Sequence, residues 1–156
     1  MVRLLFLGTG TSYGVPMIGC ECAVCRSEDL RNRRTRASAL VRVDDAALLI
    51  DTATELRVQA LRVGLSHVDA VLYTHCHADH LHGIDDLRSF SERRRESIPT
   101  FGNEETVAFI RRNYAYIFED TAFRLGWGIP RLELRVMHGP TDVAGVRVTP
   151  VPVSHG

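Results

Sequence analysis

A cluster of metal-binding side chains occupies residues 74–83, which read T-H-C-H-A-D-H-L-H-G. His75 and His77 are two residues apart, so in extended backbone their imidazoles point the same way. Asp79 and His80 are adjacent and open the next expected helix, so they diverge towards a second centre. Imidazole and carboxylate suit zinc, manganese or iron, and two ions about 3.5–4 Å apart commonly hydrolyse phosphate esters. A polar loop rich in histidine by chance is the alternative. Because four of the seven histidines fall in this stretch, the spacing favours a two-metal loop.

Three cysteines form a second cluster, C-x-C-x-x-C, at Cys20, Cys22 and Cys25. The apolar run over residues 1–7 is too short for a signal peptide, so we expect a cytoplasmic location. In such a reducing compartment, clustered thiols bind metal more often than they form disulfides. The spacing therefore predicts a closed, tetrahedral structural zinc site, and the alternative is three small buried residues or a chance cluster.

Length and charge limit the classes of partner. The 156 residues are sufficient for one domain with a sizeable core, so we expect a single domain over residues 1–156. The formal net charge is zero, which does not favour binding to nucleic acid or to an anionic membrane. No stretch approaches the roughly 18 apolar residues that cross a bilayer, so we expect no membrane association.

A succession of strands and helices must position the histidine and cysteine clusters. Strands are expected at 2–7, 37–43, 46–51, 70–73, 98–101, 132–136 and 146–153, and helices at 54–63, 84–94 and 103–114. The strands at 2–7 and 70–73 are expected to be buried. Asn103 is the expected cap of the last helix, with Glu104 and Glu105 in its first turn. The short strand at 70–73 delivers the histidine loop, and a long glycine-rich loop carries the cysteines. This pattern alone indicates only that helices and strands are mixed.

The motifs resemble those of a known family. H-x-H-x-D-H after a strand is similar to the signature of the metallo-β-lactamase superfamily. The stretches Gly8–Pro16, Cys20–Cys25 and Gly83–Arg88 resemble its phosphodiesterase branch, which includes the accessory phosphodiesterase of bacterial phosphonate breakdown. The resemblance runs from Val2 to Gly156 and implies an α+β fold, an αββα sandwich of which this chain holds the N-terminal half and the start of the second half.

The resemblance also implies a set of ligands. His155 matches the third histidine of the first metal, beside His75 and His77, and the alternative is a surface histidine. Three histidines leave a coordination position open for water, as a catalytic metal requires. Asp79 and His80 match ligands of the second metal, and Asp79 is the residue to which we assign a catalytic role.

Other nearby residues receive weaker assignments. Asp51 lies near where the family supports the metal ligands, although capping the helix at 54–63 is an equally good role for that stretch. Cys76, between two ligands, is expected to point away from the metals as a small core residue.

Several family ligands have no counterpart in this sequence. The family completes the second metal with a bridging Asp and a further His, the cysteine site with a distant His, and the reaction with a proton-donating His, all downstream of Gly156. We therefore expect the chain to be C-terminally truncated, with an incomplete second site, weak turnover, and an exposed sheet face that favours self-association.

The expected function is a metal-dependent hydrolase that acts on small or cyclic phosphodiesters through a metal-activated hydroxide, with Zn²⁺ or Mn²⁺ in the catalytic site and a structural Zn²⁺ at the cysteines. One alternative is another hydrolase of the superfamily, acting on a thioester, a lactam or a tRNA precursor. The cysteine cluster favours the phosphodiesterase branch. A second alternative is a truncated metal-binding module without turnover.

Overall fold

The computed structural model describes residues 1–119 and 128–155. Its strands are β1 (Val2–Gly8), β2 (Ser38–Val43), β3 (Ala46–Ile50), β4 (Ala70–Leu72), β5 (Ile98–Gly102), β6 (Leu132–Val136), β7 (Thr141–Val143) and β8 (Val146–Val148). Its α-helices are α1 (Leu56–Arg62), α2 (Ala78–Leu81), α3 (Arg88–Arg94) and α4 (Glu104–Asn113), and its 3₁₀ turns are η1 (Leu30–Asn32), η2 (Ile84–Leu87) and η3 (Ala115–Ile117). No described helix is long and apolar enough to cross a bilayer.

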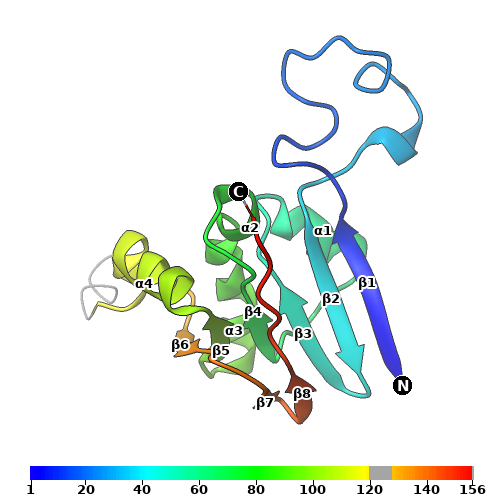
Figure 1. The fold of residues 1–156 in the computed structure, drawn as a ribbon. Coiled ribbons are helices and arrows are strands. Elements are labelled where there is room, and N and C mark those ends of the chain that lie inside the picture. Colours follow the sequence, from blue (N-terminus) through cyan, green and yellow to red (C-terminus); the bar gives the residue numbers. More distant parts are fainter. Residues whose placement is uncertain (120–127, 156) are drawn as a thin grey trace.

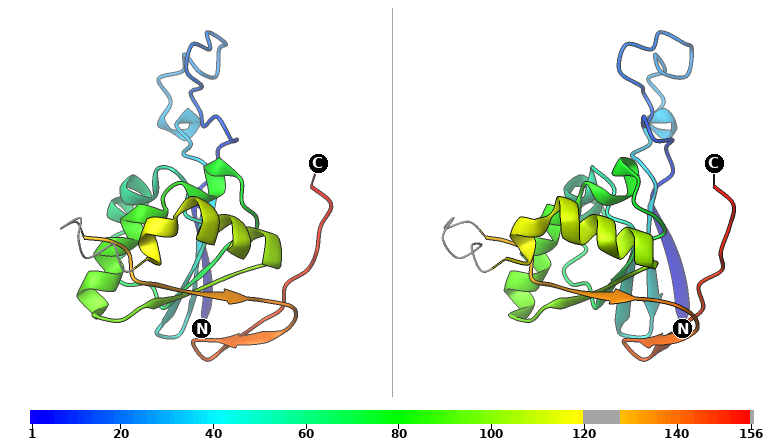
Figure 2. Two further views of the ribbon diagram at one scale, coloured as in Figure 1. Left: turned by 90° about the vertical axis from the view of Figure 1, so that its left-hand side faces the viewer. Right: turned by 60° about the vertical axis from the view of Figure 1, so that its left-hand side comes forward.

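A six-stranded mixed sheet forms the centre of the fold, in the order β1-β2-β3-β4-β5-β6 (Figure 1). The pairs β1–β2 and β2–β3 are antiparallel, whereas β3 to β6 are parallel. Crossovers between parallel strands are almost always right-handed, so strands added in one direction place their helices on one face. The α1, α3 and α4 helices lie on that face, and the β7–β8 hairpin and residues 149–155 lie on the other (Figure 2).

The two faces of the sheet carry separate apolar cores. The larger core packs the sheet against the helices and includes Leu40, Leu49, Leu56, Leu81 and Ile110, all fully buried. The smaller core packs the opposite face against the hairpin and consists of Leu48, Ala70, Phe101 and Val143, with partly buried neighbours around them. Alternate residues of one strand point to opposite faces, so neighbours such as Leu48 and Leu49 belong to different cores.

Local signals in the sequence account for several element boundaries. The Asn103 side chain accepts a hydrogen bond of 2.8 Å from the backbone N–H of Thr106, which confirms the expected helix cap. Asp44 adopts a positive φ of 50° in the turn between β2 and β3, the two strands expected at 37–43 and 46–51. Asp tolerates this left-handed conformation better than most residues.

Two of the expected strands differ from the structure. The strand expected to be buried at 2–7 is the edge strand β1, in which Leu7 is buried but the residues before it are exposed, because it has a neighbour on one side only. The alternating stretch 146–153 is a strand only to Val148. Pro150 and Pro152 have no backbone N–H to donate to a ladder, so pairing stops there.

The parallel arrangement decides where functional loops meet. The strands β1, β3 and β4 point the same way, so Gly8, Asp51 and Tyr73 stand together at the edge of the sheet formed by the carboxyl ends of these strands. The loop of residues 9–37 leaves from this edge and projects beyond it, and the last described residues return to it (Figure 1). The polar side chains that follow these strands can therefore converge at this edge.

Candidate metal centre

Hydrogen bonds hold the histidine loop against Thr52, which lies between β3 and α1. The backbone N–H of Thr52 donates to the His80 carbonyl at 2.8 Å, and the N–H of Gly83 donates to the Thr52 carbonyl at 2.9 Å. The buried Thr52 hydroxyl lies 2.8 Å from the Tyr73 hydroxyl and donates to the Leu81 carbonyl at 3.0 Å. These bonds fix both ends of the loop, so its ligands have a rigid base.

Three histidines converge at this edge. His75, His77 and His155 each present a ring nitrogen, and these nitrogens all lie within 4.8 Å of one another. His75 Nε2 is 3.0 Å from His77 Nδ1, and the His155 ring centroid is 4.7 Å from that of His75 and 5.2 Å from that of His77. The expected grouping of these residues is therefore present in the geometry.

The donor set fits a divalent ion. Imidazole nitrogens are ligands of zinc and manganese, and a three-histidine set leaves a position for water. Burial lowers the pKa of His75, and the neighbouring His80 and His77 rings lower it further. A lowered pKa favours the neutral imidazole, which is the form that binds metal.

A second pair of ligands lies beside the first group. His80 Nε2 is 3.4 Å from Asp79 Oδ2, and the His80 ring centroid is 4.2 Å from that of His75. Within residues 1–119 and 128–155, no third side chain joins Asp79 and His80 in a metal-ligand group. The structure thus brings together the two expected ligands of the second site without completing it.

Asp51 forms a hydrogen bond with His80, one of this second pair. Its Oδ2 lies 2.7 Å from His80 Nδ1, and this hydrogen bond is the main cause that raises the pKa of His80. A carboxylate on the second ring nitrogen is the usual environment of a metal-bound histidine. Of the two roles considered for Asp51, this contact matches support of a metal ligand. Thr74, which no sequence signal singled out, also bonds to this carboxylate.

Cys76, between His75 and His77, was expected in the core. It is only half-buried, and it is absent from both core clusters of the described residues. The reason is that the loop runs along the edge of the sheet, where neither layer covers it.

The cysteine cluster lies in the projecting loop. The Sγ atoms of Cys20, Cys22 and Cys25 lie within 4.8 Å of one another, and all are free thiols. The backbone N–H of Cys25 donates to Cys22 Sγ at 3.5 Å and, with the neighbouring thiols, lowers the pKa of Cys22 to about 7. Easily formed thiolates fit a zinc site, although the described residues contribute no fourth ligand to this group.

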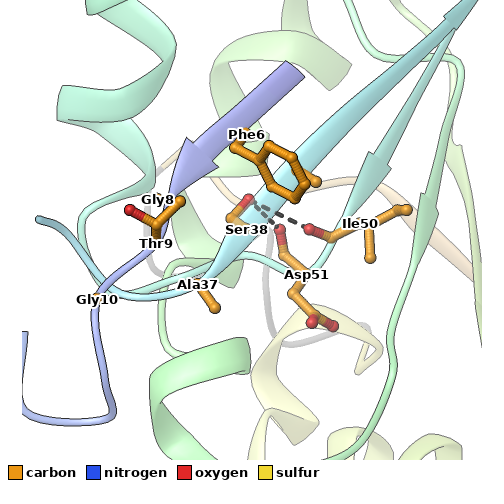
Figure 3. A pocket seen from close by; sticks show the side chains of 9 residues that line it. Phe6, Gly8, Thr9, Gly10, Ala37, Ser38, Ile50 and Asp51 are labelled. Carbon is orange, nitrogen blue, oxygen red and sulfur yellow. Dashed lines mark hydrogen bonds between the residues drawn. The ribbon is translucent and has the colours of Figure 1, made fainter. Parts of the chain in front are cut away.

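A pocket of about 300 Å³ opens beside Asp51 (Figure 3). Phe6, Ala39 and Ile50 give it apolar walls, and the Ser38 hydroxyl donates to the Ile50 and Asp51 carbonyls at 3.2 and 2.9 Å. The pocket places apolar surface next to the carboxylate that supports His80.

Comparison with known proteins identifies the family. A family model for the beta-lactamase superfamily domain matches residues 47–156, which contain all the candidate histidine ligands. The chain belongs to this superfamily. The resemblance drawn from the H-x-H-x-D-H motif is confirmed, and so is the α+β fold class expected from it.

Two solved structures are similar to this chain. A chain described as a new diphosphatase from the PhnP family is 40% identical with a TM-score of 0.87, over 99% of this chain and 59% of that one. Zn²⁺-bound PqqB from Methylobacterium extorquens is 19% identical with a TM-score of 0.68, over 92% of this chain and 48% of that one. The second likeness shows the fold alone.

A relative in Porphyromonas gingivalis named octanoyltransferase is 39% identical over an alignment of 158 positions, which covers 99% of this chain and 31% of the relative. The chain thus spans about a third of that relative and 59% of the similar diphosphatase.

Proposed function

We propose that this chain is a metal-dependent hydrolase of small or cyclic phosphodiesters, with Zn²⁺ or Mn²⁺ at the histidine edge and structural Zn²⁺ at the cysteines. The convergence of His75, His77 and His155 carries the proposal, because His155 lies far along the chain from His75 and His77, yet all three present their nitrogens within 4.8 Å of one another. The similarity to a PhnP-family diphosphatase supports phosphorus chemistry.

The residues assigned to each ion have different surroundings. His75, His77 and His155 would hold the first ion, and Asp79 with His80 would contribute to a second. When bound, such ions polarise a phosphoryl oxygen and lower the pKa of coordinated water. Asp51 accepts the Nδ1 proton of His80 and so orients Nε2 of that ring towards Asp79. Asp79 is the residue that we propose acts in catalysis, since its carboxylate lies 3.4 Å from His80 Nε2, the ring nitrogen that we assign to the second ion.

Diphosphates are a second candidate class of substrate, because the similar structure of 40% identity is described as a diphosphatase. In both classes water adds to phosphorus while the bond from phosphorus to the leaving oxygen breaks, and the leaving oxygen takes up a proton. The two classes differ in the leaving group, which is an alkoxide in one and a phosphate in the other.

Turnover by the purified chain tests the proposal. The protein would be loaded with Zn²⁺ or Mn²⁺ and assayed with bis(4-nitrophenyl) phosphate, a diphosphate ester, a thioester and a lactam. We expect measurable hydrolysis of the phosphodiester, lost in His77→Ala and kept in His82→Ala. His82 is a suitable control because it is in the same motif but lies outside the ligand group. If the loaded chain cleaves only the thioester or the lactam, the phosphodiesterase proposal is wrong. If it binds metal and cleaves nothing, the chain is a metal-binding module without turnover.

A further inference from the structure

Thr74 stands between a carboxylate and a metal ligand. Its hydroxyl oxygen lies 2.8 Å from Asp51 Oδ2 and 2.9 Å from His75 Nδ1, and its backbone N–H donates to Asp51 Oδ1 at 2.8 Å. Asp51 Oδ2 also lies 2.7 Å from His80 Nδ1. One carboxylate is therefore connected to both imidazoles, directly to His80 and through a hydroxyl to His75.

The chemistry of these groups fixes the direction of each hydrogen bond. A carboxylate can only accept, so the single proton of the Thr74 hydroxyl is donated to Asp51. The hydroxyl oxygen then accepts from His75, whose proton must be on Nδ1. His80 likewise donates from Nδ1 to Asp51. Both rings are thereby held as the tautomer with a free lone pair on Nε2.

The free nitrogens point to the places where ligands are needed. His75 Nε2 faces His77 Nδ1 at 3.0 Å, and His80 Nε2 faces Asp79 Oδ2 at 3.4 Å. Each of these pairs belongs to one of the two candidate metal positions. The network therefore selects the Nε2 atom as ligand in both positions.

Asp51 is itself held in a fixed orientation. It follows β3 with a positive φ of 60°, and its side chain is 5% exposed. Its backbone N–H donates to the Leu72 carbonyl at 3.0 Å, and its carbonyl accepts from Ser38 Oγ at 2.9 Å. Because β2, β3 and β4 all hold this residue, its carboxylate is a rigid reference point for the two rings.

We propose that Thr74 is a positioning residue whose hydroxyl connects the Asp51 carboxylate to His75 by hydrogen bonds. The buried Asp51 carboxylate thereby sets the tautomer and the orientation of one ligand in each metal position, His75 in the first and His80 in the second. The role of this network in metal binding rests on the proposed function. The tautomers of His75 and His80 do not depend on a bound metal, so they can be measured separately in the metal-free protein.

Substitutions at two residues separate the relay from its source. Thr74→Val keeps the size and the backbone N–H but removes the hydroxyl, and it should change the tautomer balance of His75 while leaving His80 unchanged. Asp51→Asn should change both rings, and Thr74→Ser should restore the wild-type pattern at His75. Thr141→Val is the matched control, since Thr141 lies in the distant β7 and its hydroxyl donates to the nearby Gly139 carbonyl. The tautomers would be read from ¹⁵N spectra of the imidazoles in metal-free protein, at a pH where the rings are neutral.

Zinc affinity gives the second measurement. Loss of a group that orients a metal ligand typically weakens affinity about 10–100-fold. We expect a loss of this size for Thr74→Val at the histidine site, none at the cysteine site, and wild-type affinity for Thr74→Ser and Thr141→Val. Competition with a chromogenic chelator would measure each affinity, with circular dichroism confirming that every variant is folded.

The possible results are distinct. An unchanged His75 tautomer in Thr74→Val overturns the relay, whatever the affinity. A changed tautomer with unchanged zinc affinity overturns its role in metal binding. If the wild-type histidine site binds neither zinc nor manganese, the proposed function fails, and the spectra of the metal-free protein still decide whether Thr74 sets the tautomer.

Discussion

The His155 ring lies 4.7 Å from the His75 ring in a T-shaped contact, although the two residues come from distant parts of the chain. Residues 149–155, which carry His155 along the open face of the sheet, are all exposed. Within the described residues, their backbone N–H groups donate no hydrogen bond, and Val151 and Val153 are 75% and 81% exposed. At the far end of this segment, the His155 ring contacts the rings of His75 and His77.

Metal binding should order this segment. An ion bound by His75, His77 and His155 would tie residues 149–155 to the histidine loop, where only ring contacts act otherwise. We expect added Zn²⁺ to slow amide hydrogen exchange in peptides covering 144–156, measured by mass spectrometry. His155→Ala should abolish this protection, and Cys22→Ala should retain it. Equal exchange with and without Zn²⁺ in a protein shown to bind the ion at the histidines would contradict the prediction.

The two metal groups should load independently, because they share no ligand. His77→Ala should lose the metal at the histidine edge and keep about one zinc ion per chain at the cysteines. Cys22→Ala should do the reverse and should also lower the free energy of unfolding, since structural zinc contributes to folding. Elemental analysis of protein purified without added metal would measure this. A folded variant that has lost both ions would show that the sites are coupled.

Gly83 is a position of the histidine loop where the backbone packs too closely against its neighbours to leave room for a side chain. A Cβ atom there would lie 2.2 Å from the Ala53 carbonyl oxygen and 2.8 Å from Leu56 Cβ. Gly83→Ala should therefore destabilise the protein by about 1–3 kcal/mol or more, because the backbone of the next segment must move. Gly139→Ala is the control, since a Cβ there meets nothing within 4 Å. Urea unfolding curves would compare them, and equal midpoints would refute the predicted close contact.

The exposed side of β1 should promote self-association. Val2, Leu4 and Phe6 alternate along this edge strand and so share one face, which the hairpin does not cover. An uncovered edge strand with an apolar face favours association between copies of the chain. We expect light scattering to show a mass above that of the monomer, and Leu4→Lys to lower it. Leu61→Lys should have no effect, because Leu61 is 66% exposed but lies on α1, away from this face. A wild-type chain that stays monomeric at high concentration would disprove this expectation.

Local chemistry made much of the candidate centre predictable from the sequence. The ligands of the histidine loop are neighbours in the chain, so a strand followed by H-x-H-x-D-H places them together whatever the rest of the fold does. The same holds for Cys20, Cys22 and Cys25, whose spacing brings three thiols into one turn of loop. Resemblance to a family supplied His155, which no local pattern connects to His75.

Only the tertiary structure brought Asp51 and Thr74 into one network with His80. Asp51 and Thr74 follow neighbouring parallel strands, and their side chains meet because β3 and β4 end at the same edge of the sheet in a defined register. No pattern of residue types contains that register. The same dependence explains the exposure of β1, which has a neighbour on one side only. The end of β8 at Val148, in contrast, follows from Pro150 and Pro152, which are already present in the sequence. Spacing along the chain determined which side chains could share an ion, whereas strand order determined what holds those side chains in position. The physical reason is that a ligand motif depends on contacts a few residues apart, and its support depends on hydrogen bonds between segments that only the folded sheet makes adjacent.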